Sequence, residues 1–150
     1  MDTGYSDITA FLEDFSLDPP LQQMKLYPHH GQVSTYDHCM HVAMFSYELV
    51  RRLRLDINLD TLLTGAMLHD FYLYDWHARD GGTHRLHGLR HPHTAAVNAR
   101  RYYAVSDDVA HVIESHMWPL TLTRIPKTAE AWIVCTADKW VSVRETLFGR

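Results

Sequence analysis

The sequence predicts an all-α domain, a helical bundle of about six or seven helices. Apolar residues recur at helical spacing along most of the 150-residue chain, whereas no segment alternates apolar and polar residues as a half-buried β-strand does. Serine, asparagine and proline stand at the starts of these apolar stretches, where such residues begin helices. Hydrophobic residues make up 46% of the chain, enough for one core, so we expect a single domain over residues 1–150.

Three helices are predicted in the first half of the chain, over residues 6–15, 34–53 and 58–70. Ser6 is a candidate N-cap for the first of them, and the Pro-Pro pair at 19–20 lies beyond its end. Ser34 or Thr35 begins the second helix. Asn58 caps the third, because its side-chain oxygen can accept a free N–H of the first turn.

Three more helices are predicted in the second half, over residues 92–103, 106–116 and 127–148. Pro92 suits a first helical position, where its missing N–H costs nothing. Ser106 is an N-cap followed by Asp107, whose negative charge is favourable at a helix N-terminus. The connection before Pro92 contains Gly81, Gly82 and Gly88 and is predicted to be a loop.

Charge and hydropathy exclude several classes of function. The net charge of −4 gives no positive field for nucleic acid or an anionic membrane. No apolar run reaches the roughly 18 to 20 residues of a membrane span, and the N-terminus lacks the pattern of a secretory signal. Cys39 and Cys135 are too few for a disulfide framework. We therefore expect a cytoplasmic protein that binds neither a nucleic acid polymer nor a membrane.

Ionisable residues stand on apolar helix faces in three of the predicted helices. His38, Asp138 and the adjacent pair His69 and Asp70 each lie three, four or seven positions from apolar residues. A single residue of this kind is more often a hydrogen-bonded core histidine or a paired carboxylate. Several converging from different helices are hard to satisfy without a cation, and helical bundles commonly build metal sites in this way.

These segments resemble the HD-domain metal-dependent phosphohydrolases, whose pattern is a histidine, an adjacent His-Asp pair and a distal aspartate, all on helices. His38 stands in HCMHVA, which is similar to the segment of the first ligand. His69 and Asp70 stand in LLTGAMLHDF, similar to the defining pair. Asp138 stands in VCTADKW, similar to the Ala-Asp-Lys segment of the last ligand.

Two further histidines resemble the additional ligands of the two-metal branch of this family. His91 lies in HPHTAA and His116 in VIESHMWP, between the His-Asp pair and the distal aspartate. The resemblance covers the motif-bearing core, about residues 35–145, and is greatest to small single-domain bacterial HD hydrolases of unassigned substrate. These share a segment like LHDFYLYDWH, a His/Arg-rich loop that ends in His-Pro, and a CxADK motif.

The resemblance implies a centre of two divalent transition-metal ions. Its metal ligands would be His38, His69, Asp70, His91, His116 and Asp138. Asp70 is the natural bridging ligand and a catalytic residue, because a carboxylate has two oxygens whereas an imidazole offers one lone pair. Imidazole and carboxylate ligands suit Fe, Mn, Co, Ni or Zn better than Mg or Ca, and the sequence does not choose among these metals.

The implied activity is that of a phosphomonoesterase or phosphodiesterase, which uses a metal-activated water on a small phosphate ester, with nucleotides among the candidates. Lys139, beside the last ligand, is a candidate catalytic and substrate-binding residue that could hold a phosphate oxygen. Arg85 and Arg90 are candidate substrate-binding residues, because guanidinium groups bind phosphate in a bidentate manner. The expected partner is thus a small phosphorylated substrate. His84, His87 and His93 could support a ligand as outer hydrogen-bond partners, and Asp75 could orient a ligand histidine.

Departures from the family pattern and alternatives remain. Met117 follows His116 where the cyclic-dinucleotide phosphodiesterases have a second histidine, and their Gly-Tyr-Pro motif is absent. The Glu-Asp motif of the alarmone hydrolases is also missing. An HD-type di-iron oxygenase has the same order of six ligands, and a ligand-binding module could retain the metal site. A homodimer is left open.

Overall fold

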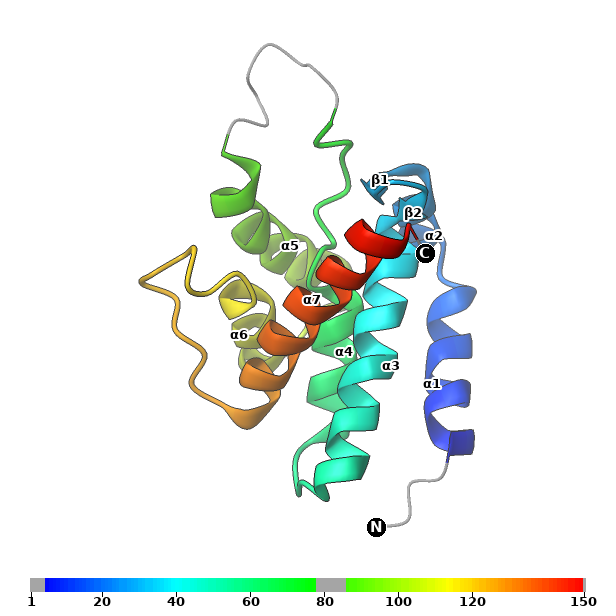
Figure 1. Cartoon of the computed structure of the whole chain (residues 1–150), viewed down its shortest axis with the longest axis vertical. Helices are drawn as coiled ribbons and strands as arrows, with labels where there is room; N and C mark the ends of the chain where they lie inside the picture. Colours follow the sequence, from blue (N-terminus) through cyan, green and yellow to red (C-terminus); the bar gives the residue numbers. More distant parts are fainter. Residues whose placement is uncertain (1–4, 78–85, 150) are drawn as a thin grey trace.

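The computed structural model describes residues 5–77 and 86–149, and this part of the chain forms an all-α bundle with a small β-hairpin (Figure 1). The helices are α1 (Tyr5–Ser16), α2 (Pro19–Gln23), α3 (Thr35–Leu53), α4 (Leu59–Leu68), α5 (His87–Tyr103), α6 (Asp107–Ser115) and α7 (Ala129–Phe148), and a 3-10 turn covers Met24–Leu26. Helix α4 lies in the middle and packs against α3, α5, α6 and α7. The predicted fold class is confirmed.

Side-chain caps set the start of α3, α4, α6 and α7. Each cap accepts the backbone N–H of the residue three positions later, at 3.0 to 3.2 Å, and the caps are Ser34, Asn58, Ser106 and Thr128. The predicted starts at Ser34, Asn58 and Ser106 are confirmed. The last helix begins at Ala129, two residues after the predicted start, because Thr128 provides its cap.

Helix α5 begins at His87, five residues before the start that Pro92 predicted, so this boundary was wrong. Pro92 lies inside the helix, where it lacks the N–H that would reach the fourth residue before it. The extra first turn is supported from outside the helix. The His87 ring stacks on Trp76, with ring centroids 5.0 Å apart.

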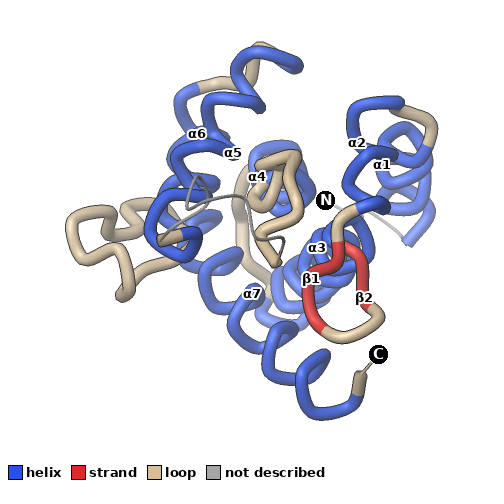
Figure 2. Tube along the Cα trace, turned by 90° about the horizontal axis from the view of Figure 1, so that it is seen from above, coloured by secondary structure: helices blue, strands red, loops and turns tan. Residues whose placement is uncertain are grey.

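The structure also contains a small β-hairpin that the sequence analysis did not predict. Strands β1 (Pro28–His30) and β2 (Val33–Ser34) pair in an antiparallel hairpin, whose turn contains Gly31 with a φ of 58°. Strands this short cannot show an alternating pattern in the sequence. The hairpin lies beside α3 and the C-terminal part of α7 (Figure 2), and β1 contacts both helices.

The core between α4 and its neighbours is dense and apolar. Leu62, Val112 and Val134 have no exposed surface, and each such side chain contributes about 1.5–3 kcal/mol through burial. Helices α4 and α6 approach closely at Gly65, where an added Cβ would lie 2.5 Å from a methyl carbon of Val112. Among the described helices, none has both the length and the apolar character needed to cross a membrane.

Candidate metal centre

All six predicted metal ligands meet at the end of the bundle where α4 and α6 terminate. His38 comes from the first turn of α3, His69 and Asp70 directly follow α4, and His116 directly follows α6. Helices α5 and α7 provide the other two ligands. The six side chains are all buried, with exposed fractions between 0% and 6%, and are His38, His69, Asp70, His91, His116 and Asp138.

Three of these residues form what we call the carboxylate-rich half of the centre, namely His38, His69 and Asp138. The Nε2 atoms of the two histidines are 3.3 Å apart. Asp138 Oδ1 lies 2.9 Å from His38 Nε2 and 3.4 Å from His69 Nε2. Three potential ligand atoms on three different chain segments thus face one point, which is the arrangement that a metal ion requires.

The remaining pair, His91 and His116, forms the histidine half. Their Nε2 atoms are 2.9 Å apart. Burial lowers the pKa of His116, and its Nδ1 lies 2.6 Å from the carbonyl oxygen of Ile113. A neutral imidazole that donates from Nδ1 has a free lone pair on Nε2, so His116 directs an available metal ligand toward His91.

Asp70 joins the two halves through its two carboxylate oxygens. Its Oδ1 lies 3.1 Å from His91 Nε2 and 3.4 Å from His116 Nε2. Its Oδ2 lies 3.5 Å from His69 Nε2 and 3.7 Å from His38 Nε2. Within the described part of the chain, the buried Oδ1 atom has no hydrogen-bond partner. One carboxylate therefore faces both halves, as the predicted bridging role requires.

The other ring nitrogen of each ligand histidine has a hydrogen-bond acceptor. These Nδ1 contacts are His38 with Glu145 at 2.8 Å, His69 with the Ala66 carbonyl at 2.7 Å, His91 with the His87 carbonyl at 2.9 Å and His116 with the Ile113 carbonyl at 2.6 Å. Because the last carbonyls of a helix have no partner within it, the residue after the helix can use one. Such contacts orient each ring and direct Nε2 to the metal.

Two site residues were missed by the sequence analysis, His29 and Glu145. His29 of β1 stacks on His38, with ring centroids 3.8 Å apart, and its Nε2–H donates to Asp70 Oδ2 at 2.8 Å. Glu145 is 2% exposed and accepts from Nδ1 of both His38 and His41, each at 2.8 Å. Glu145 follows Asp138 by seven residues, a spacing that places both on one face of α7 and could have revealed it.

Ionisable groups of the carboxylate-rich half shift one another strongly. Burial alone would lower the pKa of His38, but hydrogen bonds to Asp138 and Glu145 outweigh it and raise the pKa to about 10. The pKa of His69 is also raised, since the charge of Asp70 outweighs burial. Despite burial, the His69 charge holds the pKa of Asp70 well below its usual range, and the His38 hydrogen bond does the same for Asp138. A metal cation would replace the protons on these imidazoles.

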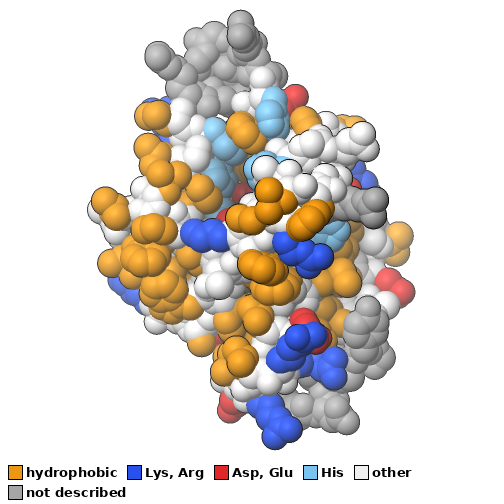
Figure 3. Space-filling view, viewed as in Figure 1, with side chains coloured by type: hydrophobic (Ala, Val, Ile, Leu, Met, Phe, Trp, Pro, Cys, Tyr) orange, Lys and Arg blue, Asp and Glu red, His pale blue; other side chains and the backbone are white. Residues whose placement is uncertain are grey.

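A cavity of about 930 Å³ opens onto the centre. Asp70, His91, His116 and Asp138 lie at its floor. Figure 3 shows histidine side chains gathered in the upper part of this face, with hydrophobic side chains around them. The floor thus exposes both halves of the centre to a ligand.

The candidate substrate-binding residues lie in different places. Lys139 lines the cavity, but its Nζ donates to the carbonyl oxygen of His116 at 2.9 Å and to that of Cys135 at 3.2 Å. Arg90 is exposed on α5 and does not belong to the described residues that line the cavity. Arg85 and the candidate outer partner His84 lie outside the described residues.

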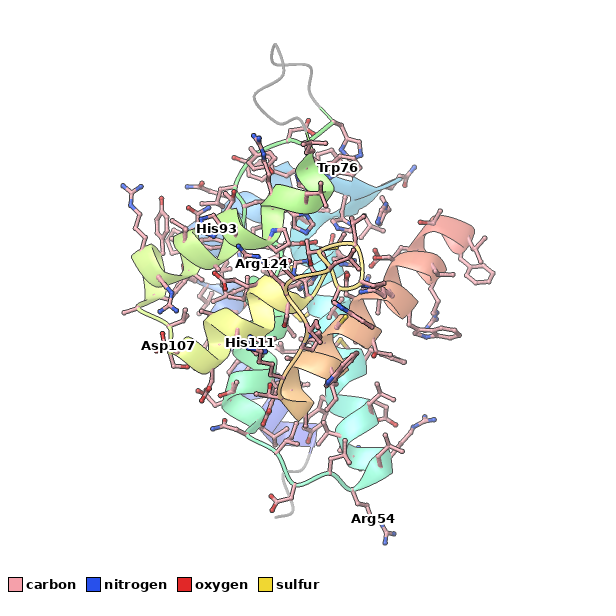
Figure 4. All side chains as sticks on the ribbon, turned by 90° about the vertical axis from the view of Figure 1, so that its left-hand side faces the viewer. Arg54, Trp76, His93, Asp107, His111 and Arg124 are labelled. Carbon is pink, nitrogen blue, oxygen red and sulfur yellow. The ribbon has the colours of Figure 1, made fainter. Side chains whose placement is uncertain are left out.

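Other histidines have contacts of their own, and Figure 4 labels two of them, His93 on α5 and His111 on α6. The ring of His111 accepts the Lys127 N–H at 2.9 Å, which ties α6 to the start of α7. His93 lies 3.8 Å from Glu114. His87, in contrast, supports the centre through its carbonyl and by stacking on His91.

The donor set fits a transition-metal centre. Four imidazoles and two carboxylates suit Mn, Fe, Co, Ni or Zn, and the unpartnered Asp70 oxygen is a free anionic ligand in a buried place. A third group of potential ligands, His29, His38 and Glu145, shares His38 with the carboxylate-rich half. We interpret it as outer support, because Glu145 contacts the ring nitrogen of His38 that faces away from Asp138.

The comparisons with known proteins identify one family. The family model described as HD domain matches residues 35–140, which is more than two thirds of the chain. Comparison with curated proteins and with solved structures found no match. The matched range begins in the first turn of α3 and ends in α7, so it contains all six ligands of the centre.

Proposed function

The chain belongs to the HD-domain superfamily of metal-dependent phosphohydrolases, and we propose that it hydrolyses a small phosphate ester at a centre of two metal ions. The reaction is that of a phosphomonoesterase or a phosphodiesterase. The observation that supports this proposal most is Asp70, whose two oxygens each face a separate set of imidazoles. Such a carboxylate is suited to bridge two cations.

Each half would hold one ion from among Fe, Mn, Co, Ni and Zn. His38, His69 and Asp138 would hold the first, His91 and His116 the second, and Asp70 both. When bound, the ions supply Lewis-acid activation of a water molecule and neutralise charge on the phosphoryl oxygens. The chain keeps the ligand rings in place through Glu145 and the three backbone carbonyls at Nδ1.

Hydrolysis adds the oxygen of a water molecule to phosphorus and breaks the bond between phosphorus and the ester oxygen. The released alcohol takes one proton of the water, and the phosphate keeps the other. The cavity directs the ester toward this floor, where the Lys139 ammonium provides a positive charge beside His116. That charge favours the approach of a phosphate dianion.

The test is a panel of phosphate monoesters and diesters with protein loaded in turn with Mn, Co, Ni, Zn or Fe(II), and the Fe(II) protein is assayed both without and with oxygen. We expect release of phosphate or of a monoester with at least one metal, and none from Asp70→Ala. Turnover that requires oxygen and iron would instead identify the HD-type oxygenase. Ligand binding with no turnover across the panel would identify a binding module, and either result would overturn the proposal.

A further inference from the structure

We propose that the cavity accepts an apolar organic group, so that the substrate is the phosphate ester of an alkyl or aryl alcohol rather than of a nucleoside or a sugar. This inference deepens the proposed function and rests on it. The floor of the cavity carries the ionisable metal ligands, whereas its walls are mainly apolar. Most polar groups in those walls are already hydrogen-bonded within the protein.

The walls away from the centre are mainly apolar. Met117, Pro119 and Leu120 line one side, and Val143 of α7 and Trp76 line others. Leu120 is 55% exposed and Val143 is 53% exposed, so apolar surface is open to the cavity. An apolar group that covered this surface would be bound through the hydrophobic effect.

A stacked column stiffens the wall formed by α5. Figure 4 shows Trp76 beside the first turn of this helix. The Trp76 and His87 rings are nearly parallel, at an angle of 7°, and His87 in turn stacks on His91 at 15°. The Tyr74 hydroxyl lies 2.7 Å from His87 Nδ1 and holds the middle ring. A wall fixed in this way presents a preformed surface to a ligand.

Most polar side chains of the described walls already have partners. Lys139 donates to two backbone carbonyls, and Ser142 donates to Asp138 at 3.5 Å. His87 bonds to Tyr74. Among the described lining residues, the buried Trp76 Nε1–H and the buried His29 Nδ1 have no hydrogen-bond partner, and His30 is the other polar side chain there. The described lining contains no arginine, asparagine or glutamine, and its carboxylates are those of the metal centre. A nucleobase or sugar buried there would lose hydrogen bonds to water without replacing them.

The size of the cavity calls for a large organic group. At about 930 Å³ it lies near the upper end of the range that drug-sized ligands fill, about 300–1,000 Å³. A phosphoryl group at the floor would leave most of that volume to the alcohol part. The lining residues described above would then contact the organic group rather than the phosphate.

A homologous series of n-alkyl phosphates tests the proposal on the metal-loaded protein. From ethyl to octyl phosphate we expect kcat/KM to rise by up to about fourfold for each added methylene, the factor expected when each one is fully buried. The matched n-alkylphosphonates, which have no ester bond to hydrolyse, should show the same rise in affinity by calorimetry. Adenosine and uridine 5′-monophosphate and glucose 6-phosphate should be poorer substrates than hexyl phosphate.

Paired variants locate the contact. Leu120→Asn and Val143→Asn should each flatten the dependence on chain length for both the phosphates and the phosphonates. Leu122→Asn and Leu147→Asn are matched controls, because these leucines are 72% and 70% exposed and lie outside the described lining. All four positions are at least half exposed, so the fold should tolerate asparagine there.

The outcomes separate this inference from the proposed function. Hydrolysis of nucleotides or sugar phosphates with a flat alkyl series would overturn the apolar substrate class and leave the hydrolase intact. Alkylphosphonate affinity that rises with chain length, without hydrolysis of any ester, would support the cavity assignment and reject the hydrolase. A chain-length effect that survives both lining variants would also overturn the inference.

Discussion

The two halves of the metal centre differ in the chemical groups that form and orient their ligands. The carboxylate-rich half combines His38, His69 and Asp138 with the shared Asp70, and a third carboxylate, Glu145, supports it from behind. In the described part of the histidine half, the Nδ1 atoms of both ligand rings contact backbone carbonyls rather than a carboxylate, and the shared Asp70 is its carboxylate ligand.

Their relation to the cavity differs as well. Both histidines of the histidine half line the cavity, whereas His38 and His69 do not belong to its described lining. More negative charge and deeper placement favour tight cation binding. We therefore expect the carboxylate-rich half to retain its ion and the histidine half to bind more weakly, close to the substrate.

The largest effect should come from the residue that the halves share. Asp70→Ala removes the bridging carboxylate, so we expect metal content per chain to fall from two ions to nearly none and hydrolysis to fall to background. Elemental analysis and phosphate release measure the two. Asp75→Ala is the control, since that carboxylate accepts the His77 N–H on the surface. A variant that kept both ions and full turnover would show that the halves do not depend on Asp70.

Loss of the histidine half alone should be less complete. His116→Ala should reduce metal content from two ions to one and lower turnover by at least about 100-fold, because one ion cannot clamp the phosphoryl group as two do. His111→Ala, on the helix that directly precedes His116 but bonded to the Lys127 N–H, should keep both ions. Simultaneous loss of both ions in His116→Ala would contradict the independence of the halves.

The metal affinities of the two halves should also depend differently on pH. The pKa of His38 is raised to about 10, so this ring is protonated at pH 7 and metal binding must displace its proton. Because the pKa of His69 is raised as well, metal binding displaces a proton from each of the two rings, and the affinity of the carboxylate-rich half should rise with pH by up to about 100-fold per unit while both rings are protonated. The pKa of His116 is lowered, so this ring carries no proton that a metal ion must displace above neutral pH, and the metal affinity of the histidine half should change little there. Calorimetric titration of His116→Ala between pH 7 and 9 measures the first dependence, and a flat result would refute it.

Loss of the carboxylate that accepts the His38 Nδ1–H should weaken metal binding only in the carboxylate-rich half. In Glu145→Ala, His38 loses the acceptor at Nδ1, and we expect about 10–100-fold weaker metal binding in that half. Glu48→Ala is the matched control, because Glu48 pairs with Arg52 on the surface of α3. Competition with a chromophoric chelator measures the affinity. If Glu145→Ala weakened binding of the ion in the histidine half instead, the assignment of Glu145 to the carboxylate-rich half would be wrong.

The role of Glu145 could not be predicted from the sequence, because it depends on tertiary packing. Helical periodicity and capping residues predicted the bundle, because these signals act within one helix. The positions of His38 and Asp138 followed from their apolar surroundings, and the family resemblance added His91 and His116. The partners of these ligands depend on tertiary packing. Glu145 reaches His38 from a helix that lies 107 residues further along the chain.

Short elements were the least predictable. The hairpin that carries His29 has strands of three and two residues, too few for a pattern. Its contact with Asp70 arises only because the hairpin packs beside α3. The first turn of α5 was also not predictable. Pro92 is typical of a first helical position and so predicted a later start, whereas the earlier turn is supported by stacking on Trp76, a tertiary contact.

The smallest effect should distinguish holding a ligand from binding the substrate. Lys139 donates to the His116 carbonyl and also lines the cavity, so it belongs to the histidine half in either role. If its charge holds the phosphate, Lys139→Met should raise KM about tenfold, the worth of one charged hydrogen bond, and leave two ions bound. Lys127→Met, at an exposed lysine outside the described lining, is the control. Loss of the ion from the histidine half in Lys139→Met would show instead that the lysine acts through His116, and metal analysis beside the KM measurement decides between the two roles.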